Sequence, residues 1–194
     1  MKRILLIGLV FFLGKFIQAQ NLDQDSWAIK NLTNNEISAY QSLLTFTESQ
    51  IGCNSSGQYK EKCWKRFLDS KFFNRTTGRI RLPWSLKAQN SFIGKLNLEE
   101  VTDSIWIKSW SWNPVTQDTV DYYYLDFYGS LGTLYSAAAR SNETWKEIWQ
   151  HIQSTGEIGP SLHAGLFHPE INKLLYDPKM RLLLSLELMR LNKN

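Results

Sequence analysis

Asp103–Gly129, which reads DSIWIKSWSWNPVTQDTVDYYYLDFYG, is the stretch that decides the fold. It holds three of the eight tryptophans and four of the eight tyrosines of the chain. Residues 104–112 alternate strictly between two sets of side chains, which is the two-residue period of a β-strand. Residues 119–128 are rich in the aromatic and β-branched residues that strands favour. Asn113-Pro114 and Gln117-Asp118 between them are turn residues, so the segment predicts one β-hairpin.

The register of this hairpin decides which side chains share a face, because a slip of one residue turns a whole strand over. With a four-residue loop at 114–117, one face combines flat aromatic rings with an acid and a base, which suits a polar ligand such as a sugar. The facing pairs in that register are Trp106–Leu125, Lys108–Tyr123 and Trp110–Asp121. A loop one residue longer places Trp110 against Tyr122 and Trp112 against Val120, which makes the same face an ordinary packed core. The sequence leaves both registers open.

The first 19 residues have the pattern of a secretory signal peptide. Lys2 and Arg3 precede the apolar run Ile4–Leu13, and Ala19 is the small residue expected before a cleavage site. The run is short for a bilayer span and Lys15 ends it, although an uncleaved anchor remains the alternative. We therefore predict a secreted or periplasmic protein with no stable membrane span after processing, and a single domain over residues 20–194.

Processing changes the charge of the chain. The full sequence has 22 basic and 18 acidic residues, a net charge of +4. Lys2, Arg3 and Lys15 leave with the signal peptide, so 19 basic and 18 acidic residues remain. A nearly neutral domain lacks the clustered cations that a nucleic-acid interface needs, and we predict no nucleic-acid partner.

Helical patterns precede the central hairpin. Thr33 and Glu36 form a capping box ahead of a helical stripe, and a second helix follows the turn at 54–57. In an exported protein the two cysteines, Cys53 and Cys63, are expected to pair, because two cysteines allow only one intramolecular bond. These features predict a helical hairpin closed by a disulfide.

Two further strands are expected between the helical hairpin and the aromatic one. Residues 80–86 alternate, although Pro83 restricts them to an edge strand, and Phe92–Leu98 is a second short strand with Gly94 as a bulge. The result is an antiparallel meander of about four strands. We predict an α+β fold in which this small sheet packs with the N-terminal helical hairpin and with C-terminal helices.

The C-terminal part of the chain carries two helical signals. The stripe Trp145, Ile148, Trp149 and Ile152, opened by Asn142 or Ser141 as a cap, predicts an amphipathic helix packed on the sheet. Met180–Leu191 is mostly leucine and methionine; its leucines also alternate, but its residue types favour a buried helix over a strand.

The sequence contains no catalytic signature that we recognise, so an enzyme is the less favoured interpretation. His163, His168 and Glu170 are the residue types of a zinc site. Their spacing does not place them on one helical face, and no H-E-x-x-H motif is present, so we interpret them as scattered surface residues and predict neither metal nor cofactor.

These observations predict an exported, non-catalytic binding protein that uses the aromatic hairpin. Trp106, Trp110, Trp112 and Tyr123 are the expected anchors, and Lys108 and Asp121 the polar guides. An envelope glycan or another exported protein is the expected ligand. Two alternatives are a hydrolase that uses the His163/His168 region and a carrier of an apolar ligand with the leucine-rich terminal segment lining a cavity.

Overall fold

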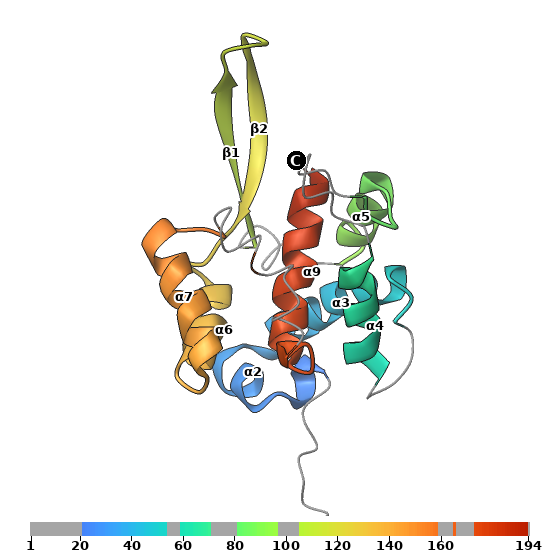
Figure 1. Ribbon diagram of the computed structural model, residues 1–194, viewed down its shortest axis with the longest axis vertical. Helices are drawn as coiled ribbons and strands as arrows, with labels where there is room; N and C mark the ends of the chain where they lie inside the picture. Colours follow the sequence, from blue (N-terminus) through green and yellow to red (C-terminus); the bar gives the residue numbers. More distant parts are fainter. Residues whose placement is uncertain are drawn as a thin grey trace, which may run out of the picture.

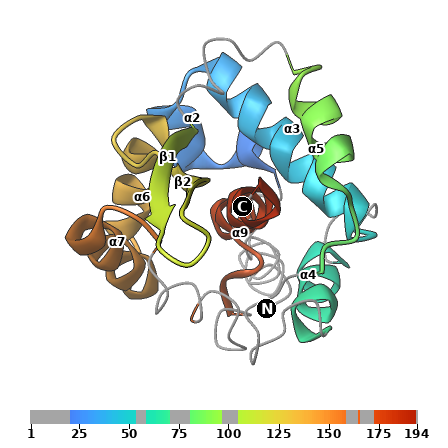
Figure 2. The same ribbon diagram turned by 90° about the horizontal axis from the view of Figure 1, so that it is seen from above.

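The computed structural model describes residues 21–53, 59–70, 81–96, 105–158, 165 and 173–193. Helices surround one central helix, and a two-stranded β-ribbon projects beyond them along the long axis (Figures 1 and 2). The elements, in chain order, are η1 (Leu22–Gln24), α2 (Ser26–Asn31), α3 (Asn34–Gln50), α4 (Tyr59–Asp69), α5 (Leu86–Ile93), β1 (Trp106–Asn113), β2 (Asp118–Leu125), α6 (Ser130–Ala139), α7 (Glu143–Thr155) and α9 (Pro178–Lys193). The predicted α+β class is confirmed.

The C-terminal helix α9 is the centre of the core. Figure 2 shows it end-on, with the other helices arranged around it. Residues 180–189 are all buried, and the helix packs against α3, α5 and β2. This segment is mostly leucine and methionine, with the buried charged residues Arg181 and Glu187 among them, so it needs protein around it on every side, and the surrounding helices provide this cover. The prediction of a buried terminal helix, rather than a strand, is confirmed.

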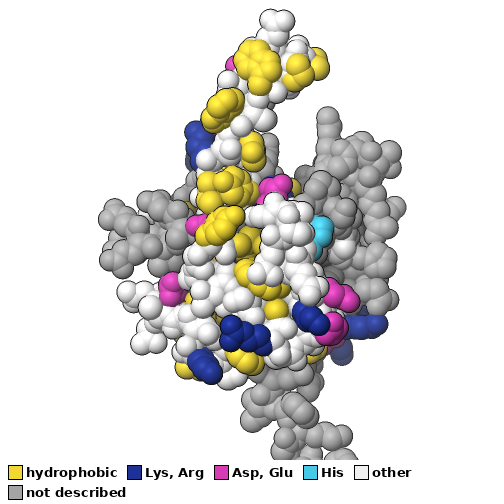
Figure 3. Space-filling view, turned by 90° about the vertical axis from the view of Figure 1, so that its left-hand side faces the viewer, with side chains coloured by type: hydrophobic (Ala, Val, Ile, Leu, Met, Phe, Trp, Pro, Cys, Tyr) yellow, Lys and Arg dark blue, Asp and Glu magenta, His cyan; other side chains and the backbone are white. Residues whose placement is uncertain are grey.

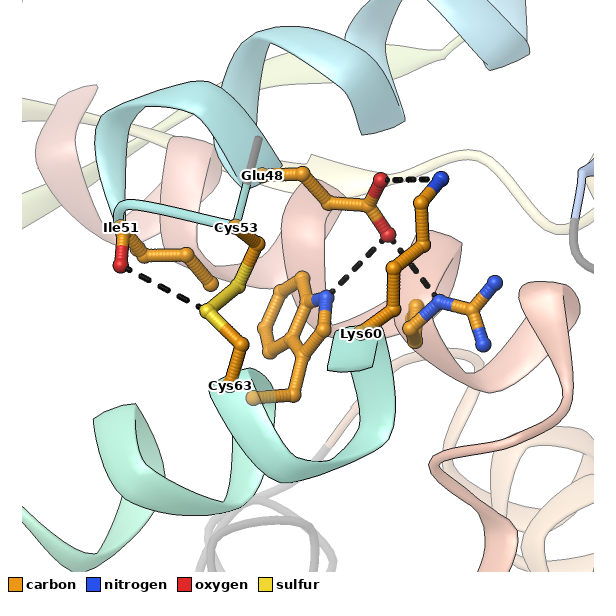
Figure 4. Close-up of a disulfide and its surroundings, with 7 residues drawn as sticks. Glu48, Ile51, Cys53, Lys60 and Cys63 are labelled. Atoms are coloured by element: carbon orange, nitrogen blue, oxygen red, sulfur yellow. Dashed lines mark hydrogen bonds and ion pairs between the residues drawn. A yellow bond between two sulfur atoms is a disulfide. The ribbon is translucent and has the colours of Figure 1, made fainter. Parts of the chain in front are cut away.

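The N-terminal helical hairpin has the predicted caps and cross-link. The Thr33 hydroxyl accepts a hydrogen bond from the Glu36 N–H at 3.2 Å, and the Glu36 carboxylate accepts one from the Thr33 N–H at 2.7 Å. Cys53 and Cys63 are disulfide-bonded across a separation of 10 residues. Closing a loop of this length contributes roughly 2–3 kcal/mol in the chain-entropy model. The bond fixes the start of α4 beside the end of α3 (Figure 4).

The prediction of two additional strands is wrong wherever the structure describes these residues. Residues 81–85 are irregular, with a bend at 83–84, and α5 begins at Leu86, because the Ser85 side chain caps the helix by accepting a hydrogen bond from the Ala88 N–H at 3.2 Å. Phe92 lies in the last turn of α5, and residues 94–96 form a turn. The alternation of apolar residues at 80–86 is therefore not that of a strand. Residue 80, at the start of the first predicted strand, and residues 97–98, at the end of the second, lie outside the described residues.

Helix α7 follows its predicted stripe but packs on a different partner. The Asn142 side chain caps it by accepting a hydrogen bond from the Thr144 N–H at 2.9 Å. Trp145, Ile148 and Ile152 are buried, and the neighbouring element is α6 rather than the sheet. The rings of Trp145 and Tyr135 stack with centroids 5.4 Å apart. The ribbon therefore does not lie under α7, and its distal part extends away from the helices (Figure 1).

Candidate functional site: the aromatic ribbon

The ribbon has the register of the four-residue loop. Trp110 pairs with Asp121, Lys108 with Tyr123, and Trp112 with Thr119. The Asn113 side chain holds the turn, since its Oδ1 accepts hydrogen bonds from the N–H groups of Val115 at 2.9 Å and Thr116 at 3.3 Å. An Asn that bonds the backbone two and three residues ahead is an Asx turn, which fixes where the two strands begin to pair.

Solvent exposure changes sharply along this face from its base to its tip. At the base Trp106 is 7% exposed and belongs to the core, together with Leu125. Two residues further along β1 the Lys108 side chain is already 58% exposed, and Trp110 and Trp112 are 67% and 57% exposed. Val115 in the turn is 89% exposed. Figure 3 shows hydrophobic side chains along the projecting ribbon. We call Lys108, Trp110, Trp112, Thr119 and Asp121 the indole face.

An ion pair lies beside the first exposed indole. Lys108 Nζ and Asp121 Oδ2 are 2.7 Å apart, and both side chains are more than half exposed. The hydrogen bond to Asp121, assisted by its charge, raises the pKa of Lys108 above its ordinary value. A pair so open to water adds little to stability. Its effect is to hold a carboxylate and an ammonium group in fixed positions next to Trp110, where both still meet solvent.

The last turns of α9 hold the base of the ribbon. Arg190 donates a hydrogen bond from Nη1 to the Tyr123 carbonyl at 3.2 Å, and from Nε to the Glu187 carboxylate at 2.8 Å. Glu187 is fully buried. Because the buried acid fixes the guanidinium, β2 is attached to the central helix at one defined point. The distal part of the ribbon thus extends from a rigid base.

All six residues that the sequence proposed lie on one face of the ribbon, but only four of them are open to solvent. Lys108, Trp110, Trp112 and Asp121 form one open face. Trp106 is buried, and Tyr123 is half-buried and packed against the core, so both hold the base of the ribbon against the core. Thr119 also belongs to this face, although it was not among the residues predicted for it. The pairing of Trp112 with Thr119 follows from the correct register, which the sequence alone did not select.

The alternative metal site lies outside the described residues. His163, His168 and Glu170 belong to that part of the chain. In the segments that the structure describes, no three His, Cys, Asp or Glu side chains are grouped closely enough to hold a metal ion. The disulfide accounts for both cysteines.

A cavity of about 540 Å³ opens where α3 and α4 end. Its described lining includes Ile51, Phe67, Arg81 and Leu82, and includes no residue of α9. The idea that the leucine-rich terminal helix lines a binding cavity therefore gains no support from this pocket. Among the described helices, none has both the length and the apolar character needed to cross a bilayer.

Comparison with known proteins gives no guide to the ligand: no family model, no curated protein and no solved structure matches this chain.

Proposed function

We propose that this chain is an exported, non-catalytic binding protein, and that the indole face of the ribbon is its recognition surface. The single observation that carries the proposal is the exposure of Trp110 and Trp112 on a projecting ribbon. Trp is among the residues most enriched in the energetically dominant positions of binding surfaces. The ligands we consider are a glycan and another exported protein.

Trp110 and Trp112 are more exposed than the other tryptophans, and this difference supports a functional role for them. Trp64, Trp84, Trp106 and Trp145 are buried in the described structure, and Trp27 and Trp149 are half-buried. Leaving apolar surface in water forgoes roughly 25 cal/mol for each Å² that burial would have removed. Trp110 and Trp112 both forgo this stabilisation, and they lie close together on a rigid, projecting element. Their exposure is therefore more consistent with contact to a ligand than with a role in the fold.

Export is supported by the disulfide and by the signal-like pattern of residues 1–19. Disulfides form and persist in oxidising compartments, and Cys53–Cys63 is formed in this structure. We propose a secreted or periplasmic location after removal of the signal peptide.

The two exposed indoles should be dispensable for folding. We expect the Trp110→Ala/Trp112→Ala double variant to keep its free energy of unfolding within about 1 kcal/mol of the unsubstituted protein, since surface substitutions usually have small effects. Trp145→Ala is the matched control, because that ring is buried, and it should lose about 3–5 kcal/mol. Urea unfolding followed by circular dichroism measures both. A large loss in the double variant would mark these rings as structural and remove the basis of the proposal.

Site-specific photo-crosslinking tests binding itself, whatever the chemical class of the ligand. We expect p-benzoylphenylalanine at position 112 to form an adduct in the exporting cell, and the Trp110→Ala substitution in the same chain to reduce its yield. The control places the same probe at Ile29, which is 57% exposed on α2, and α2 lies at the end of the molecule opposite the ribbon (Figure 1). Equal adduct yields at positions 112 and 29, or no adduct at 112, would contradict the proposal.

A further inference from the structure

The geometry points to a neutral oligosaccharide chain, lying along the ribbon, as the ligand of the indole face. This inference rests on the proposed function, and it specifies the class of ligand that the surface recognises. Four properties of the face carry it: the spacing of its rings, its charge, its free hydrogen-bonding groups and its small apolar area.

The two exposed rings form an open, elongated binding surface and not a pocket. Trp110 and Trp112 are two residues apart on β1, so their Cα atoms lie about 7 Å apart on the same face. Each indole presents an electron-rich flat side. A pyranose ring has an apolar face of C–H groups that matches such a surface, and successive sugars of a chain can contact successive indoles. A single sugar cannot cover both rings.

The charge of the ribbon disfavours anionic ligands. Residues 106–125 contain one lysine and two aspartates, Lys108, Asp118 and Asp121. The lysine is already paired with Asp121. Nucleic acids, acidic polysaccharides and anionic membrane surfaces are bound through clusters of Lys and Arg, and this ribbon has no such cluster. An uncharged ligand avoids the repulsion from the two aspartates.

Polar groups next to the rings match the hydroxyl groups of a sugar. The ion pair uses Asp121 Oδ2 and one of the three donors of the Lys108 ammonium group, and both side chains remain more than half exposed. Thr119, opposite Trp112, is also exposed. The carboxylate and hydroxyl on β2 and the ammonium group on β1, all on the face of the rings, supply both acceptors and donors, which is what a polyhydroxylated chain requires.

The apolar area of the face is small for a folded protein partner. A stable protein–protein interface buries about 800 Å² on each partner, of which a little over half, about 450 Å², is apolar. A tryptophan buries at most about 250 Å². At 67% and 57% exposure the two indoles therefore offer roughly 300 Å² together. This area suits a slender chain that follows the rings.

The test uses isothermal titration calorimetry of the mature, disulfide-bonded protein with defined oligosaccharides. The neutral probes are the tetramers of β-1,4-linked glucose, β-1,4-linked N-acetylglucosamine and α-1,6-linked mannose, each with its monosaccharide. The anionic probe is tetragalacturonate. We expect at least one neutral tetramer to bind about two- to tenfold more tightly than its monosaccharide, since one additional stacked ring contributes about 0.5–1.5 kcal/mol. We expect tetragalacturonate to bind more weakly than that tetramer.

Two further measurements test whether binding depends on stacking against the indoles or instead on charge: the salt dependence of the affinity and the effect of tryptophan substitutions. The affinity for the neutral tetramer should change less than about twofold between 50 mM and 1 M NaCl, because screening acts on charged ligands. Trp110→Ala and Trp112→Ala should each weaken binding about tenfold, whereas Trp110→Tyr should recover part of the loss, because it keeps a flat ring. Ile29→Ala should leave the affinity unchanged.

The possible results distinguish the inference from the function on which it rests. Binding restricted to tetragalacturonate, or to no oligosaccharide in the set while crosslinks at position 112 lead to a protein, overturns the inference and leaves the proposed function standing. Tetramer binding that survives the double tryptophan substitution overturns the assignment of the glycan to this face. Absence of both oligosaccharide binding and a position-112 crosslink overturns the inference and the proposed function together.

Discussion

The Glu48→Ala variant is expected to lose about 3–5 kcal/mol of its free energy of unfolding, because this one carboxylate neutralises two cations in the core. Glu48 Oε1 is 3.0 Å from Arg181 Nε, and Oε2 is 2.7 Å from Lys60 Nζ. The Glu48 and Arg181 side chains are only 4% and 2% exposed. Burial lowers the pKa of Arg181, and the charge of Glu48 opposes that shift. Removing the acid takes the neutralising charge away from both cations, although Arg181 keeps its hydrogen bonds to the Leu175 and Tyr176 carbonyls.

Glu48 also connects three helices, so its substitution should remove several contacts between helices and not only one ion pair. The Trp64 indole N–H donates to Glu48 Oε1 at 3.3 Å, which ties α4 to α3, while Arg181 ties α9 to α3. Figure 4 shows Glu48 and Lys60 beside the disulfide that joins the same two helices. A loss of this size is a large part of the 5–15 kcal/mol that stabilises a typical domain.

Chemical denaturation monitored by circular dichroism measures this effect, and Glu143→Ala provides the control. Glu143 forms an ion pair with Lys146 at 3.1 Å on the exposed side of α7, and its substitution should cost no more than about 1 kcal/mol. If the two variants lost similar amounts, the network around Glu48 would not be a main support of the core.

The second large effect is expected for Lys179→Met, at about 3–5 kcal/mol, since this buried ammonium group bridges one buried carboxylate, Asp25, and one partly buried carboxylate, Asp177. Lys179 Nζ is 2.6 Å from Asp25 Oδ2 and 3.0 Å from Asp177 Oδ1. Asp25 caps α2 by accepting hydrogen bonds from two of its N–H groups. Asp177 caps α9 and accepts a hydrogen bond from the Trp145 indole at 3.0 Å. Without Lys179, two negative charges remain close together in the core.

A double-mutant cycle distinguishes the charge from simple repacking. Met keeps much of the length of Lys, so the loss in Lys179→Met should come from the unpaired acids. Adding Asp25→Asn to Lys179→Met should then cost less than Asp25→Asn alone, with a coupling energy of about 0.5–3 kcal/mol. Strict additivity of the two substitutions would contradict the interpretation. Lys146→Met on the exposed face of α7 is the control for loss of a lysine from a helix.

Local sequence signals predicted the elements whose determinants are local. The Thr33–Glu36 capping box, the Asn142 cap and the Asn113 turn all involve residues within three positions of one another. The central hairpin and the terminal helix were predicted for the same reason, from strict alternation and from residue type. In the strand predicted at 80–86, by contrast, the alternation was misleading, because the cap at Ser85 determines the structure there.

The charged core was missed because its partners are far apart in the sequence. Glu48 and Arg181 are separated by 133 positions, and Asp25 and Lys179 by 154. A buried pair of this kind leaves no periodic pattern, since each member appears as one charged residue in an otherwise ordinary helix. Only the ring of helices around α9 brings them together.

The sequence predicted which tryptophans share a face of the candidate site, but it did not predict how exposed each of them is. Alternation placed Trp106, Trp110 and Trp112 on one face, and the structure keeps them there. Their exposures differ because the helices cover the base of the ribbon and leave its distal part free, so Trp106 is buried and the other two are open. The point at which a strand leaves the body of a protein is a tertiary property that residue periodicity does not contain.

The central claim is that the indoles of Trp110 and Trp112 are the groups that contact a ligand. Two-dimensional NMR of the protein labelled with ¹⁵N at its eight tryptophans tests this directly, because each indole N–H gives one cross-peak and Trp110→Phe and Trp112→Phe identify two of them. On titration with the tightest-binding oligosaccharide, we predict shifts of the Trp110 and Trp112 peaks, with the peaks of the buried Trp64, Trp84 and Trp145 unchanged. Shifts confined to other indoles, with the Trp110 and Trp112 peaks unmoved at saturation, would contradict the account.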